Sequence, residues 1–255
     1  MKYFHSNIDI SNHDEIIGTL LLHSNLPGPR GNLELIEEFA TVFSNLQQDD
    51  AHFEFLFKLW KTPSTGDDAE TILVLSGLWG FGYFAINNQY RSRVYPVFQC
   101  AMNDPRWRVR EIIQESLKIV ARHDYNQFVS LYASYDHPTL LELRAFLSTA
   151  AHPEILKESH QHNFAIHLLK QSFDRYLIVS QQLTKKDLAF DAYQKGLMFA
   201  PSVIVAACPA LGFQVLNSYA NKSPLLNKVL ISNLKKNRLI KKYGDTCESC
   251  LSILQ

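Results

Sequence analysis

Cysteine is scarce in this sequence, neither sign of charge is in excess, and no apolar run is long. The start, MKYFHSNIDISNHDE, lacks the apolar core of a secretory signal. The chain also has only four cysteines, and without a signal they favour reduced thiols over a disulfide framework. We therefore expect a cytoplasmic protein. No apolar run approaches the roughly 20 residues that span a bilayer, so we expect no membrane insertion. The net charge of zero argues against a uniformly basic protein that binds nucleic acid.

Motifs for catalysis and for metal or cofactor binding are also missing. The segment SGLWGFGYF is no P-loop, because no Gly-Lys-Ser/Thr follows it, and the chain has no GxSxG nucleophile elbow. His160, His162 and His167 lack the HExxH spacing, and a helix places the first two on different faces. Cys247 and Cys250 form one CxxC without the second that a tetrahedral zinc site needs. We therefore predict no catalytic residue, no metal site and no cofactor, with metal or redox use of these groups as the minor alternative.

Charge is unevenly distributed although its total is zero. The stretch Ala192 to Gly244 contains no Asp or Glu but eight of the 25 basic residues. Only Asp245 and Glu248 of the 25 acidic residues lie beyond it, so residues 1–191 hold 17 basic and 23 acidic side chains. The chain is therefore acidic first and basic near its end.

The apolar pattern predicts helix after helix and no β-strand, with short breaks between them. In the break LPGPRGN, Leu26 to Asn32, proline and glycine forbid a helix, and we expect Asn32 to cap the next one. The inner face of that helix is predicted to hold Leu33, Ile36, Ala40 and Phe43. The predicted helices are Ile16–Leu22, Leu33–Leu46, Ala51–Trp60, Ala69–Ala85, Arg93–Met102, Trp107–Ala121, Asn126–Ser134, Leu140–Ala151, His162–Gln182, Asp187–Phe199, Pro201–Ala220 and Leu225–Ile240, with a shorter turn at Ile155–His160.

The most informative stretch is DPRWRVREIIQESLKIV, Asp104 to Val120. We expect Asp104 to cap its helix and Pro105 to occupy the first helical position, where a missing N–H costs nothing. The apolar stripe of this helix consists of Val109, Ile112, Ile113, Leu117 and Val120. Such a helix cannot bury its stripe alone, so it implies stacked neighbouring repeats.

Gly77, Gly80 and Gly82 are interpreted as sites of close helix packing or of a helix break beside Trp79.

The segments DHPTLLELRAFLSTAA and KSPLLNKVLISNLKKNRLI repeat this pattern of a proline followed by apolar residues at spacings of three and four. Together with DPRWRVREIIQESL and LPGPRGNLELIEEFA, they resemble a family of uncharacterised bacterial HEAT-repeat proteins over about Leu26 to Leu239. The resemblance implies an all-α fold, a right-handed α-solenoid of HEAT-like (ARM-type) helical hairpin repeats. It also implies one repeat domain over residues 1–255, with possible terminal capping helices at 1–25 and 244–255.

The same resemblance extends in fold to the HEAT-like DNA-alkylation-repair superfamily. In its glycosylases a Trp lies a few residues before the key Asp, roughly as a WxxVD segment. Here Trp60 is followed by KTP, Trp79 by GFGYF and Trp107 by RVREI, so no residue matches that Asp. If the chain is an enzyme at all, the resemblance implies a glycosylase-like one, with no catalytic residue carried over.

Trp107, Arg108, Arg110 and Glu111 form the first candidate binding segment. A guanidinium can fork onto a phosphate or stack on a base, and an indole can stack too. The alternative is a structural role in ion pairs between neighbouring repeats. Arg144 stands in the corresponding flank position of a later repeat.

Two further candidates are basic. Arg30 sits in a turn stiffened by proline and glycine, where it could hold an anion beside a helix start or simply lie on the surface of a hairpin turn. The run KKNRLIKK contains Lys235, Lys236 and Arg238 and is predicted to continue a helix with Leu239 and Ile240 inward. This run could bind phosphates or an acidic partner, or it could be a solvated helix end.

The sequence favours a non-catalytic HEAT-like repeat protein that binds a macromolecular partner, most simply a protein, through its concave surface. The alternative is a nucleic-acid-binding or DNA-alkylation-repair-like protein. It would use a basic groove built from Trp107, Arg108, Arg110, Arg144 and the C-terminal lysines. The partner and the oligomeric state are left open.

Overall fold

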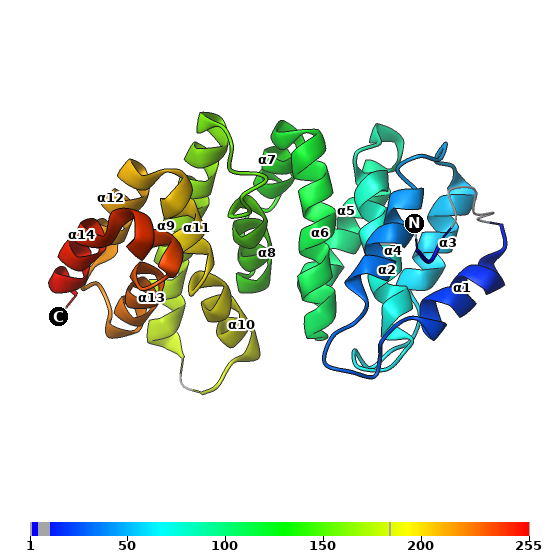
Figure 1. Cartoon of the computed structure of the whole chain (residues 1–255), viewed down its shortest axis with the longest axis horizontal. Helices are drawn as coiled ribbons and strands as arrows, with labels where there is room; N and C mark the ends of the chain where they lie inside the picture. The colour runs from blue at the N-terminus through cyan, green and yellow to red at the C-terminus, as the bar shows by residue number, and fades with distance from the viewer. Residues whose placement is uncertain (1, 5–10, 184, 255) are drawn as a thin grey trace. The chain divides into compact units, whose positions relative to one another are not determined.

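A computed structural model describes residues 2–4, 11–183 and 185–254, and the regular structure in these ranges is entirely α-helical, as the sequence predicts (Figure 1). The helices are α1 (His13–Leu22), α2 (Leu33–Val42), α3 (Asp50–Trp60), α4 (Thr71–Ala85), α5 (Asn88–Met102), α6 (Trp107–His123), α7 (Tyr125–Ala133), α8 (Leu140–Ala150), α9 (Ser159–Gln182), α10 (Leu188–Leu197), α11 (Ala200–Ala207), α12 (Pro209–Tyr219), α13 (Pro224–Leu234) and α14 (Asn237–Ile253).

The chain divides into two compact units, Met1–Leu131 and Tyr132–Gln255, which are described separately. In the first unit α4 is the central helix, packed against α2, α3, α5 and α6 (Figure 1). Nearly every residue of α4 is buried, which is why its sequence is apolar on all sides rather than striped. The prediction of one repeat domain over 1–255 stays a prediction.

Glycines allow α4 to approach its neighbours closely. A Cβ atom on Gly77 would lie 2.7 Å from the carbonyl oxygen of Leu56 in α3. A Cβ atom on Gly82 would lie 3.0 Å from the Cα atom of Ser116 in α6, and the Ser116 hydroxyl donates to the Leu78 carbonyl at 2.8 Å. Because the backbones themselves are in contact, the close-packing interpretation of these glycines is confirmed and the helix is not broken there.

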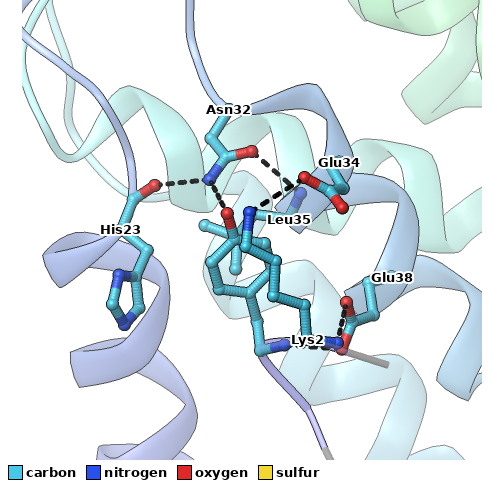
Figure 2. A network of polar contacts seen from close by, with 7 residues as sticks. Lys2, His23, Asn32, Glu34, Leu35 and Glu38 are labelled. Atoms are coloured by element: carbon cyan, nitrogen blue, oxygen red, sulfur yellow. Dashed lines mark hydrogen bonds and ion pairs between the residues drawn. The ribbon is translucent and has the colours of Figure 1, made fainter.

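The turn before α2 is held by its own side chains. As predicted, Asn32 caps α2, its Oδ1 accepting from the Leu35 N–H at 3.1 Å (Figure 2). Its Nδ2 donates to the His23 carbonyl at 2.9 Å and to the Tyr3 hydroxyl at 3.1 Å. The prediction that Leu33 lies inside is wrong: it is 57% exposed, because the first residue of α2 points away from the core that Ile36 enters.

The backbone of the N-terminal residues is tied to α2 by one carboxylate. Glu38 accepts backbone N–H groups from Lys2, Tyr3 and Phe4 at 2.8, 2.9 and 2.6 Å. Figure 2 shows Glu38 beside Lys2. Burial by itself raises the pKa of Glu38, but the three N–H donors outweigh it and lower the pKa below its usual value. Phe4 is buried against Phe39, with ring centroids 5.7 Å apart.

Helix α6 begins two residues later than Pro105, so the predicted capping by Asp104 is wrong. The N-cap residue is Arg106, whose backbone is extended and whose side chain makes no cap bond. The Asp104 carboxylate instead accepts from the backbone N–H and the Nε of Arg106, both at 2.8 Å. The guanidinium therefore takes up the carboxylate that the cap would have used.

In the second unit α9 packs against α8, α11, α12 and α13, while α14 packs against α11, α12 and α13. Asn233 ties three helices together: its Oδ1 accepts the Ser202 N–H at 2.9 Å and its Nδ2 donates to the Leu197 carbonyl at 2.8 Å. Because Asn233 is fully buried, each of these partners satisfies a polar group that water cannot reach.

Two of the predicted helices are each split in two. The predicted Pro201–Ala220 helix breaks at Cys208, because Pro209 lacks an N–H and starts α12 instead. The predicted Leu225–Ile240 helix breaks between α13 and α14, at Lys235 and Lys236, so the basic run does not continue one helix. Leu239 is buried as predicted, whereas Ile240 is exposed, so its inward placement is wrong.

The predicted terminal helices are partly described. Within 1–25 lies α1, while residues 1 and 5–10 fall outside the described residues. Helix α14 has a non-helical backbone at Tyr243, beside Gly244, and its last segment coincides with the predicted helix at 244–255, of which residue 255 is not described. Their capping role stays a prediction.

Candidate functional site

The first unit contains a pocket of about 610 Å³ between the turn before α2, the middle of α4 and the first half of α6. This volume is in the range of small-ligand and side-chain pockets. Its apolar wall consists of Pro29, Leu33, Leu75, Trp79, Trp107 and Ile112. Its polar groups are Arg30, Arg108, Glu111, Gln114 and Glu115. Four of the candidate residues predicted from the sequence thus line one cavity: Arg30, Trp107, Arg108 and Glu111.

The apolar wall has a buried part and an exposed part. Trp79 is 9% exposed and lies one turn after Leu75 on α4, so both form the interior of the wall. Trp107 is 49% exposed and Leu33 is 57% exposed, so they form its accessible part. Large apolar side chains this exposed around a cavity are typical of binding surfaces.

Arg108 is a structural residue of the pocket. It is 7% exposed, and its guanidinium donates to the Gly66 carbonyl at 3.0 Å and to the Gly28 carbonyl at 2.8 Å. It also pairs with Asp67 at 3.1 Å and lies over the Trp107 ring at 4.3 Å. Because its donors are used by two loops, Arg108 holds the wall together rather than presenting free N–H groups to a phosphate.

Arg110 does not line the pocket. Its Nη1 donates to the Pro105 carbonyl at 2.8 Å and to the Asp104 carbonyl, so it stabilises the loop that precedes α6. Both carbonyls lie just before the helix that carries Arg110, and the alternative of an ion-pair ladder between neighbouring repeats stays a prediction.

The acidic groups of the pocket lie one turn apart on α6. Glu115 pairs with Lys118, which is only 9% exposed, and Glu111 makes an interaction of its own. The cavity therefore contains two carboxylates as well as two guanidinium groups, and its charge is mixed rather than uniformly positive.

Arg30 is the exposed cation of the pocket. Within the described residues its side chain has neither a hydrogen bond nor an ion pair. The turn that carries it is fixed by the bond from Arg108 to Gly28 and by the Asn32 N–H, which donates to the Ser24 carbonyl at 2.9 Å. The fold therefore fixes the backbone that carries Arg30, whereas no partner among the described residues holds its side chain.

The remaining candidates lie in the second unit. The Cγ atom of Arg144 would be 3.0 Å from a Cβ atom on Gly196, so its stem packs between α8 and α10. The guanidinium of Arg238 lies 4.4 Å from the Phe199 ring centroid, a cation–π contact. Lys235 and Lys236 flank the break between α13 and α14. None of these four lines the pocket of the first unit.

Sequence reasoning missed Trp79, Leu75 and Glu115 as pocket residues. The signal for Glu115 was present, because residues 107, 111 and 115 follow one another at the four-residue spacing of a helix face. For Trp79 there was none: α4 is apolar on every side, so its sequence does not show which face meets the cavity.

Metal-ligating side chains are not gathered in the described part of the chain: no group of three or more His, Cys, Asp or Glu is placed to hold an ion. His160 lies 3.4 Å from Glu158. Cys247 and Cys250 are free thiols, and burial raises the pKa of both.

Among the helices in the described ranges, none combines the length and apolar character needed to cross a bilayer.

Comparison with known proteins finds no matching family model, no matching curated protein and no matching solved structure. Membership of a HEAT-repeat family therefore stays a prediction, and the pocket has to be interpreted from its own chemistry.

Proposed function

We propose that this chain is a non-catalytic, cytoplasmic HEAT-like repeat protein, a right-handed α-solenoid whose concave surface binds a protein partner. In this proposal a side chain of the partner enters the pocket beside Trp107. The observation that carries the proposal is an apolar cavity with an accessible tryptophan and leucine, surrounded by charges of both signs.

Mixed charge favours a protein partner over a polyanion. A nucleic-acid groove needs several cations that are free to contact phosphates. Arg108, one of the two arginines that line the pocket, is already bonded to carbonyls and to Asp67, and two carboxylates share the cavity. Tryptophan and arginine are also enriched among the residues that dominate protein–protein binding energy.

Affinity capture from native lysate with mass spectrometry tests this proposal. Wild type, Trp107→Ala and Leu22→Ala are compared; Leu22 is 78% exposed in the same unit and does not line the pocket. We expect the amount of captured partner to fall by about tenfold or more with Trp107→Ala, the effect typical of a truncated hot-spot residue. With Leu22→Ala the captured amount should equal that of wild type. Equal capture by all three proteins would contradict the proposal.

The alternative, nucleic-acid binding, is supported by the basic stretch in the second unit. Lys228, Lys235 and Lys241 are exposed, and in the described part of the chain no acidic side chain pairs with them. A gel-shift titration of a short DNA duplex across salt concentration tests it. Binding that weakens with a log–log slope of about −0.9 per contacted phosphate, reduced by Lys235→Gln, would support the alternative. Absence of binding at low salt would remove it.

A further inference from the structure

We infer that the pocket takes a bulky apolar side chain from an acidic segment of the partner, with a neighbouring carboxylate pairing with Arg30. This inference rests on the proposed function and adds the chemistry of the ligand. It follows from which charges of the pocket are already satisfied, from the rigidity of the turn that carries Arg30, and from the apolar wall beside it.

The charges of the pocket are not equally available. Arg108 is paired with Asp67 and hydrogen-bonded to loop carbonyls, and Glu115 is paired with Lys118. Glu111 makes an interaction of its own. Among the charged side chains that line the cavity, Arg30 is the one to which the described residues offer no partner. The charge that a ligand has to complement is therefore positive.

The turn that presents Arg30 is preorganised. Arg108 donates to the Gly28 carbonyl on one side, and Asn32 is fixed by His23, Tyr3 and the start of α2 on the other (Figure 2). A ligand therefore orders only the Arg30 side chain and not the loop, which lowers the entropic cost of binding.

The apolar wall defines the second half of the ligand. Leu75, Trp79 and Ile112 form the interior, while Trp107 lies half-exposed at the edge. A cavity of about 610 Å³ with these walls has room for an aromatic or large aliphatic side chain together with neighbouring groups of the same peptide. Because Arg30 lines the same cavity, the carboxylate of the ligand has to lie next to its apolar side chain in the sequence.

A carboxylate fits better than a phosphate. A phosphate monoester carries nearly two negative charges at neutral pH, while the pocket offers one unpaired guanidinium and contains two carboxylates. A single carboxylate matches a single guanidinium in both charge and bidentate geometry. The occupant is therefore an acidic, unphosphorylated peptide segment.

The test uses four capped pentapeptides on the full chain: Gly-Asp-Phe-Asp-Gly, its Asn-for-Asp form, its Lys-for-Asp form and its Ala-for-Phe form. Binding is followed by NMR of the indole N–H signals. The chain has three tryptophans, of which Trp79 and Trp107 line the pocket and the buried Trp60 does not, so Trp60 is an internal reference. We expect the acidic peptide to shift the Trp79 and Trp107 signals selectively.

Variants separate the charge from the cavity. Arg30→Gln is expected to weaken the acidic peptide about fivefold and to leave the Asn form unchanged, the effect of one exposed ion pair. Lys58→Gln, which removes an exposed positive charge outside the pocket, is expected to change neither. Circular dichroism melts of each variant confirm that the fold is kept.

The outcomes distinguish this inference from the proposed function. Equal binding of the acidic, Asn and Lys peptides overturns the acidic-segment inference, and so does displacement of the acidic peptide by inorganic phosphate alone. Neither result contradicts the proposed function, which rests on Trp107-dependent capture of the partner. A captured partner that is unaffected by Trp107→Ala overturns the proposed function and the inference together. If the Ala-for-Phe peptide binds as tightly as the parent peptide, the inference that a bulky apolar side chain enters the pocket is overturned.

Discussion

Single side chains in this protein connect segments that are far apart in the chain. Arg108 donates to carbonyls of the 26–32 turn and of the loop at Gly66, and its aromatic neighbour Trp107 forms the accessible edge of the pocket. A buried guanidinium with several carbonyl acceptors is costly to remove, because each acceptor then loses its partner away from water.

Replacing Arg108 therefore tests its structural role. We expect Arg108→Met, which keeps much of the apolar stem but has no donors, to lower the free energy of unfolding by about 2–3 kcal/mol in a urea titration. Lys58→Met, at an exposed position, should stay within about 0.5 kcal/mol of wild type. A neutral Arg108→Met result would show that the loop carbonyls are satisfied without it.

Glu38 gives a pH-dependent prediction. Because its pKa in the folded chain lies below the usual 4.5, the contribution of Glu38 to stability is fully present above pH 4.5 and is lost as the pH falls through the folded-state pKa. Glu38→Gln should therefore be less stable than wild type at pH 7, and the difference should shrink below pH 4.5. Urea titrations of both proteins at several pH values measure it, and a difference that grows on acidification would refute the assignment.

At the scale of elements, helix contacts depend on glycine where backbones meet. A Cβ atom on Gly82 in α4 would lie 2.7 Å from Ile119 Cδ1 and 3.0 Å from Ser116 Cα, whereas Gly18 in α1 has nothing within 4 Å of its added Cβ. The same substitution in two helices should therefore have opposite effects.

We expect Gly82→Ala to destabilise the protein by about 1–3 kcal/mol, because α4 and α6 have to move apart. Gly18→Ala should stabilise it by about 0.5–1 kcal/mol, because alanine favours the helix and meets no neighbour. Thermal unfolding of the two variants beside wild type provides the comparison. Similar shifts of the same sign would contradict the packing of α4 against α6.

At the scale of the whole molecule, the proposed solenoid has a measurable consequence. A compact globule of 255 residues has a radius of gyration of about 18 Å, whereas a solenoid is longer and its radius is larger. We expect small-angle X-ray scattering of the monomer to give a value clearly above about 18 Å. A value at the globular expectation would remove the solenoid and the concave surface, but not the pocket, which lies within one unit.

Helix positions followed closely from the sequence, because apolar spacing and capping are local properties. The predicted start of α2 at Leu33 and the cap at Asn32 are confirmed. The errors came where local signals competed. Asp104 was available as a cap but is taken by the Arg106 side chain, and at Cys208 the continuous apolar pattern outweighed the break that Pro209 signalled.

The sequence by itself determined an all-helical chain, the rigid turn around Arg30 and the chemical types that a binding surface would use. Only the tertiary structure decided that Arg108 is buried as a clamp, that Trp79 lines the cavity, and that Arg30 is the cation available there. The physical reason is that periodicity specifies which face of a helix is apolar. Which distant side chains meet across that face depends on how closely the helices pack, and here that depends on contacts such as Gly82 against Ser116.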